Sequence, residues 1–113
     1  MPKRLWTPSE ERIQNTNLYR FINIVNETFN QNFSEYEPLY QWSIENIPDF
    51  LACLWEFAKI KSSTPYDQVV DDVGKMPGAK WFSGARLNFA ENLLRYKDDH
   101  TALIFKEIGR AHV

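Results

Sequence analysis

The chain has 113 residues, the length of one domain, and it is 43% hydrophobic and 15% aromatic, which is enough for an apolar core. Thirteen basic and fifteen acidic residues give a net charge of −2, and the basic ones are not gathered in one stretch. This balance excludes the basic face that nucleic-acid binding needs. No apolar run approaches the roughly 18 residues of a membrane span or the core of a signal peptide. We therefore expect a cytosolic chain with neither nucleic acid nor membrane as partner.

The first helix signals lie near the amino terminus. Thr7-Pro8-Ser9-Glu10 has the Thr-x-x-Glu form of a capping box, and Asn15 or Thr16 offers a second start. One apolar stripe follows at the spacing of a single helix face: Leu18, Phe21, Ile22, Val25 and Phe29. The pattern predicts a helix over 16–30.

Two more helices are expected in the next thirty residues. Tyr36 to Trp42 fits a short helix, and Asn46 is placed to cap a longer one that runs to about Lys61. The apolar face of the longer helix is broad: Phe50, Leu51, Leu54, Trp55, Phe57 and Ala58. We expect this face to pack against the stripe of the helix over 16–30.

The remaining elements are short. Residues 68–70 fit an extended segment and 75–78 a turn. Asn88, with Glu91 three residues later, repeats the cap pattern and predicts a helix through Tyr96. Residues 101–105 have the composition of a strand but have no strand to pair with, and an isolated strand has no stability of its own.

Residues that could carry chemistry are few. Cys53 is the only cysteine and lies among apolar neighbours, which favours an inert core thiol. His100 and His112 are twelve residues apart, and the pattern around them is not that of a metal site. The two aromatics Trp81 and Phe82 are expected to pin the loop ahead of the Asn88 helix.

No phosphate-binding loop is recognisable either. The glycines, Gly74, Gly78, Gly84 and Gly109, do not form a phosphate-loop motif, and the Ser-Ser-Thr run at 62–64 has no glycine beside it. We assign no catalytic, cofactor-binding or metal-binding residue to the chain.

The run from Trp81 to Arg95 reads Trp-Phe-Ser-Gly-Ala-Arg-Leu-Asn-Phe-Ala-Glu-Asn-Leu-Leu-Arg. It resembles a sequence motif of the acyl-CoA synthetases that activate short carboxylic acids through an AMP ester. Further positions fit in the same order: Trp6-Thr7-Pro8, Tyr36, Leu39, Trp42-Ser43-Ile44-Glu45, Phe50, Trp55 and Phe57. The resemblance covers about residues 5–105, and the form of residues 90–95 favours the acetoacetyl-CoA synthetases within that family.

This resemblance implies that the chain is the amino-terminal region of a longer ligase. The parent would convert acetoacetate, ATP and CoA to acetoacetyl-CoA, AMP and pyrophosphate, with Mg²⁺ on the phosphates and adenylation before thioester transfer. The region itself would be inactive and would pack on the catalytic domain of the same chain. Arg86 is placed either to meet a CoA phosphate or to pair with Asp71 or Asp72. A stand-alone helical interaction domain is the alternative.

The expected fold is therefore mainly α, a small helical region over 1–97 plus the first, unpaired strand of a missing α/β adenylate-forming domain over 98–107. Residues 108–113, Ile-Gly-Arg-Ala-His-Val, do not continue the family pattern. The codons ATC GGA AGA GCA CAC GTC encode this hexapeptide and resemble a sequencing-library adapter, so we interpret it as an artefact and exclude it from the fold. A genuine hairpin beginning at Glu107 is the alternative.

Overall fold

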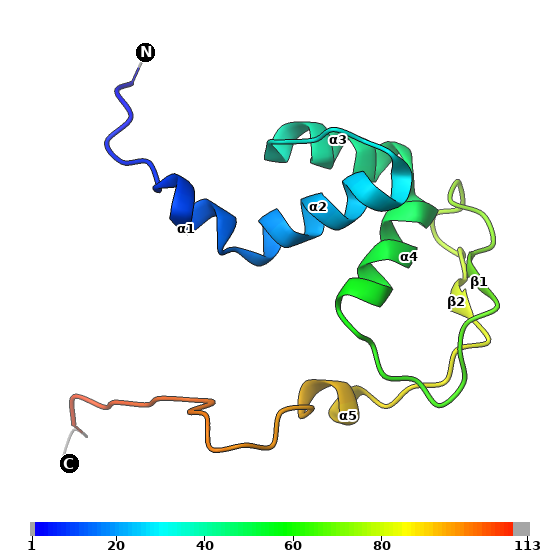
Figure 1. The fold of residues 1–113 in the computed structure, drawn as a ribbon. Coiled ribbons are helices and arrows are strands. Elements are labelled where there is room, and N and C mark those ends of the chain that lie inside the picture. Colours follow the sequence, from blue (N-terminus) through cyan, green and yellow to red (C-terminus); the bar gives the residue numbers. More distant parts are fainter. Residues whose placement is uncertain (1, 110–113) are drawn as a thin grey trace.

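Helices dominate the described residues, 2–109, of the computed structural model (Figure 1). In chain order the elements are α1 (Glu10–Gln14), α2 (Asn17–Phe29), α3 (Tyr36–Glu45), α4 (Ile47–Phe57), β1 (Gln68–Val70), β2 (Trp81–Ser83) and α5 (Phe89–Leu93). The mainly α fold class is confirmed. None of these helices has the length and apolarity of a membrane span.

The two starts predicted near the amino terminus have different outcomes. Thr16 caps α2, because its hydroxyl oxygen accepts the N–H of Tyr19 at 3.1 Å, and α2 confirms the helix predicted over 16–30. Thr7 does not cap α1. Ser9 has the extended backbone of a cap and accepts the N–H of Arg12 at 3.2 Å. The capping box was therefore placed two residues too early.

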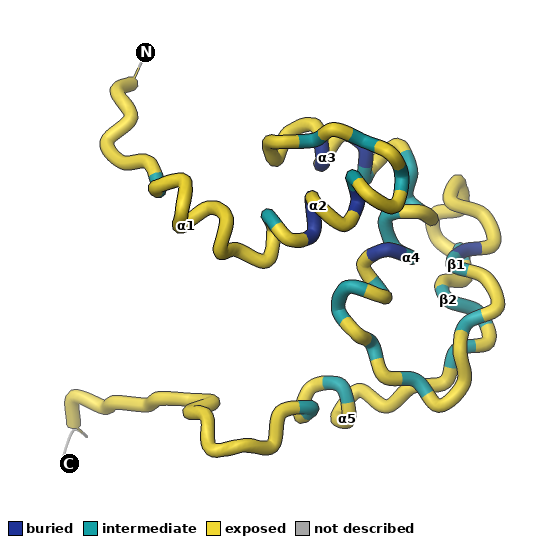
Figure 2. The backbone as a smooth tube through the Cα atoms, in the orientation of Figure 1, coloured by how far each residue is buried: buried dark blue, intermediate teal, exposed yellow. Residues whose placement is uncertain are grey.

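The core lies where α2, α3 and α4 meet, at the dark-blue positions of these three helices in Figure 2. Its buried residues are Phe21, Ile22, Val25, Leu39, Trp42 and Cys53. Phe21 packs edge-on against Phe50 and Phe57, with ring centroids 6.0 and 5.3 Å apart. The predicted contact between the faces of α2 and α4 is confirmed for these residues.

The ends of α3 and α4 differ from the prediction. α3 continues past Trp42 to Glu45. Asn46 precedes α4, but its side chain donates backwards to the Trp42 carbonyl at 3.1 Å and so closes α3 instead of capping α4. α4 ends at Phe57, not near Lys61, because Lys59 is left-handed (φ 53°) and the Ile60 N–H donates to the Trp55 carbonyl.

A two-stranded hairpin follows α4. β1 confirms the extended segment over 68–70 and pairs antiparallel with β2, with Gln68 opposite Ser83 and Val70 opposite Trp81. β2 was expected as a loop, because three residues are too few for a periodic signal. Trp55 packs on this hairpin, so its expected place against α2 was wrong.

From α5 onward the described chain extends away from the core (Figures 1 and 2). α5 ends at Leu93, three residues before the predicted Tyr96. Residues 101–105 pair with no other strand of the described chain, and Leu103, Ile104 and Phe105 are 85–92% exposed; their place as the first strand of a further domain stays a prediction. The radius of gyration is 19.6 Å, against about 13 Å for a compact 100-residue domain.

Candidate functional site

The motif from Trp81 to Arg95 begins on β2, where Phe82 joins an aromatic cluster. Phe82 stacks on Trp55 with ring centroids 4.6 Å apart, and Tyr66 meets both rings edge-on at 5.2 Å. Phe82 is left-handed (φ 50°), an uncommon conformation for a bulky residue. Packing on two other rings offsets that strain. Trp81 is 47% exposed and takes no part in this cluster, so of the two aromatics expected to pin this region only Phe82 belongs to it.

The glycine of the motif makes a tight turn. Gly84 has φ +87°, and a Cβ on it would lie 2.3 Å from a carboxylate oxygen of Asp67. The Asp67 N–H donates to the Ser83 carbonyl at 2.8 Å, which holds the acid in place. A carboxylate beside the turn repels phosphate, so this glycine does not fit an ATP or CoA phosphate.

The Ser-Ser-Thr run is tied to Arg86 through the backbone. The Ser63 N–H and hydroxyl both donate to the Arg86 carbonyl, at 2.7 and 3.1 Å, and the Arg86 N–H donates to the Thr64 carbonyl at 3.0 Å. These bonds extend the hairpin by one isolated bridge. The run is therefore a structural connection and not a phosphate cradle.

Asp71 organises the turn between β1 and β2. Its carboxylate accepts the N–H groups of Lys80 and Asp72 at 2.9 and 2.7 Å and lies 3.7 Å from the Lys75 ammonium. The Lys80 hydrogen bond is the largest cause that holds the pKa of Asp71 below its usual value. Within residues 2–109 no ion pair joins Arg86 to Asp71 or Asp72, so that alternative is not seen.

Two asparagines lie one helical turn apart: Asn88 directly precedes α5, and Asn92 is the second-last residue of that helix. Asn88 caps the helix as predicted, since its side-chain oxygen accepts the Glu91 N–H at 3.1 Å. Asn92 reaches back to the segment after α4. Its oxygen accepts the Lys61 N–H at 2.7 Å, and its amide donates to the Lys61 carbonyl at 2.9 Å.

Arg95 completes this connection. Its guanidinium donates to the carbonyls of Ala58 and Lys59 at 2.7 and 3.1 Å, and its Nε donates to the Asn92 carbonyl at 3.0 Å. Ala58 is the C-cap of α4 and Lys59 follows it, so the Arg95 cation lies just beyond the carboxyl end of α4, where it suits the helix dipole. The contacts of Asn92 and Arg95 with residues 58–61 were not predicted from the sequence. The signal that could have indicated them is a pair of polar residues three positions apart beside the apolar Leu93 and Leu94.

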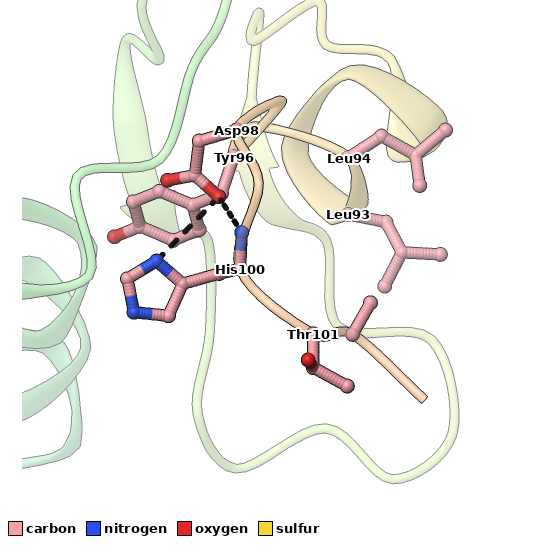
Figure 3. A pocket seen from close by; sticks show the side chains of 7 residues that line it. Leu93, Leu94, Tyr96, Asp98, His100 and Thr101 are labelled. Atoms are coloured by element: carbon pink, nitrogen blue, oxygen red, sulfur yellow. Dashed lines mark hydrogen bonds and ion pairs between the residues drawn. The ribbon is translucent and has the colours of Figure 1, made fainter. Parts of the chain in front are cut away.

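The remaining candidate residues do not assemble into a reactive site. Cys53 is buried, and burial raises the pKa of its thiol, which disfavours the reactive thiolate. The side chain of His100 is 94% exposed, and its Nδ1 lies 3.7 Å from Asp98 (Figure 3). Within residues 2–109 no group of three metal-ligating side chains comes together. His112 lies outside the described residues.

Two open grooves lie at residues around and after the end of α5, and both are larger than a third groove, of 330 Å³, along α5 itself. One of 530 Å³ runs along the segment after the helix (Figure 3), with Leu93 and Leu94 on the side opposite Asp98 and His100. The other, of 670 Å³, lies between α2 and the end of α4 and includes Arg20, Lys59 and Arg95. Neither of these two grooves brings a nucleophile to a base.

Comparison with known proteins agrees with this arrangement. Residues 36–93, half of the chain, match the family described as the acetyl-coenzyme A synthetase N-terminus. The acetoacetyl-CoA synthetase of Danio rerio is 41% identical over 104 residues, which are 91% of this chain and 15% of that protein. The malonamoyl-CoA synthetase of Penicillium aethiopicum is 40% identical over 91 residues, 80% of this chain and 12% of that protein.

A solved structure gives the same result. The acetoacetyl-CoA synthetase from Streptomyces lividans superimposes with a TM-score of 0.72 at 36% identity, and covers 80% of this chain and 14% of that one. The chain thus spans about 15% of the length of the first of these curated relatives. With the family match over residues 36–93 and this shared fold, the chain belongs to the acetyl-coenzyme A synthetase family and corresponds to its amino-terminal region.

Proposed function

We propose that this chain is the amino-terminal region of an AMP-forming acid–thiol ligase that acts on acetoacetate. The parent would convert acetoacetate, ATP and CoA to acetoacetyl-CoA, AMP and pyrophosphate in the cytosol, and its catalytic domain would follow on the same polypeptide. The observation that carries the proposal is the 41% identity to a relative named acetoacetyl-CoA synthetase over 91% of the chain.

ATP, Mg²⁺ and CoA would bind to the parent outside these residues. The turn at Gly84 faces the carboxylate of Asp67, and the Ser63–Arg86 bonds occupy the serine-rich run. The region would therefore be structural and, by itself, inactive. Its part in the parent would be a helical layer on the catalytic domain, beginning at residue 1 and ending near 97.

The proposal includes the boundaries that follow this layer. Residues 98–107 would begin the catalytic domain, which accounts for the exposure of Leu103, Ile104 and Phe105. Residues 108–113 would derive from an adapter and not from the gene; residues 110–113 lie outside the described ones. Sequencing the transcript past codon 107 tests both statements: a continuing reading frame with a Gly/Ser/Thr-rich loop supports them, and an early stop codon favours the stand-alone helical domain.

The substrate needs a separate experiment, because a relative named malonamoyl-CoA synthetase is nearly as similar as those named for acetoacetate. The full-length protein would be supplied with ATP, Mg²⁺ and CoA, and AMP release would be measured with acetoacetate, acetate or malonamate. The proposal expects the highest kcat/KM with acetoacetate. A preference for either other acid would overturn the substrate and keep the reaction class, whereas no AMP release with any of the three would overturn both.

A further inference from the structure

The attachment of α5 differs from that of α2, α3 and α4, each of which buries at least one residue. A surface helix of a globular protein normally turns its apolar residues inward and its polar residues to solvent. In α5 no residue is buried. Phe89 and Leu93, the first and last residues of the helix, are 78 and 67% exposed, and Leu94 directly after it is 60% exposed. The apolar residues thus face outward.

Polar bonds hold α5 in this orientation. Asn92 makes two hydrogen bonds to the backbone of Lys61, and Arg95 makes two to the carbonyls of Ala58 and Lys59, which follow the last residue of α4. These bonds join residues more than thirty positions apart in the sequence. They satisfy backbone groups of residues 58–61, the segment that follows α4, so the attachment is made through polar bonds.

We propose that Asn92 and Arg95 form a polar clamp that holds α5 by its polar edge and thereby presents Phe89, Leu93 and Leu94 as the docking surface for the remaining part of the same polypeptide. This inference rests on the proposed function, because it needs a parent polypeptide that is longer than these 113 residues. We call these three residues the α5 apolar face.

The length and direction of the chain identify the occupant. The segment shared with the Danio rerio relative spans 15% of that protein, so that protein is more than six times as long as the shared segment. The chain leaves α5 through Tyr96, which is 81% exposed, and continues with the exposed residues Leu103, Ile104 and Phe105. The α5 apolar face therefore lies beside the point from which the remaining polypeptide would start, and a domain that begins there can cover it without a long linker.

The clamp is tested first in the 113-residue chain by amide hydrogen exchange at Lys61. The Lys61 N–H donates to Asn92, so Asn92→Ala should speed its exchange about two- to tenfold, the factor for one ordinary hydrogen bond. Asn92→Asp keeps the acceptor and should retain most of the protection. Asn88→Ala, which removes only the cap of α5, is the matched control. Unchanged exchange at Lys61 in Asn92→Ala would overturn the clamp.

Docking is tested by the rate of maleimide labelling at Leu93→Cys, read by peptide mass spectrometry in the 113-residue chain and in the full-length protein. We expect fast labelling in the short chain and at least a tenfold slower rate in the full-length protein, with Leu94→Cys as a second probe. Glu11→Cys, exposed on α1, should label equally in both. Equal rates at Leu93→Cys and Leu94→Cys in the two proteins would overturn the docking surface.

One further variant tests whether the polar clamp is needed for docking of the α5 apolar face. In the full-length protein, adding Asn92→Ala to Leu93→Cys should restore fast labelling, because α5 is then no longer held in place. Labelling that stays slow would overturn the role of the clamp in docking. Failure of this inference is distinguishable from failure of the proposed function: protection at Leu93→Cys without AMP release would reject the ligase and retain the docking surface.

Discussion

Trp42 packs at the junction of three helices, and its truncation should destabilise all three together. It is 8% exposed and lies 5.1 Å from the ring of Phe29, 6.3 Å from Phe33 and 6.4 Å from Phe50. Trp42→Ala should cost about 3–5 kcal/mol, the usual loss when a buried aromatic is truncated. A chain of this length has a free energy of unfolding of about 5–15 kcal/mol, so the loss is a large share of it.

The assay is urea unfolding followed by the helical circular dichroism signal. With a slope of about 1.5 kcal/mol per M, the midpoint should fall by about 2–3 M. Trp55→Ala is the matched control, because Trp55 contacts Tyr66 and Phe82 of the hairpin region. It should loosen the hairpin and leave most of the helical signal.

The reasoning would be refuted by a shift below about 0.5 M for Trp42→Ala, since that corresponds to less than 1 kcal/mol at the same slope. It would equally be refuted if Trp55→Ala abolished the helical signal as completely as Trp42→Ala. Trp42→Phe, which keeps an aromatic ring in the core, should fall between the wild type and Trp42→Ala.

Four further predictions concern other parts of the chain. Asn88→Ala should destabilise α5 by about 1 kcal/mol, as loss of a good cap does; unchanged amide exchange at Glu91 would count against it. The pKa of Asp71 is lowered in the folded chain, so its contribution to stability is present above the ordinary carboxyl pKa of about 4 and is lost as pH falls through the lowered value; Asp71→Asn should reduce the acid dependence of unfolding, and identical pH profiles would contradict this. The chain alone should not bind ATP·Mg²⁺ in calorimetry, and saturable micromolar binding would show a cradle that we do not find. Because Phe89, Leu93 and residues 103–105 are exposed, the purified chain should self-associate in light scattering; a stable monomer at high concentration would favour a self-contained module.

The long helices could be predicted because their signals are local. The stripe from Leu18 to Phe29 repeats at the period of one helix face, Thr16 caps the helix that carries it, and Asn88 caps α5. The motif from Trp81 to Arg95 also identified the family before any fold was known. These features depend on residues within one or two turns of each other, which is why they can be found without tertiary contacts.

The tertiary structure decided how those helices end and which side they turn to the rest of the chain. Asn46 closes α3 rather than capping α4, Trp55 packs on the hairpin, and Asn92 and Arg95 bind residues 58–61 after α4. Asn46 chooses between two partners within a few residues of it, whereas Trp55, Asn92 and Arg95 take partners from distant parts of the chain. The amino-acid sequence alone determines the period and the caps of the helices, whereas the choice between partners follows from the free energy of the assembled fold.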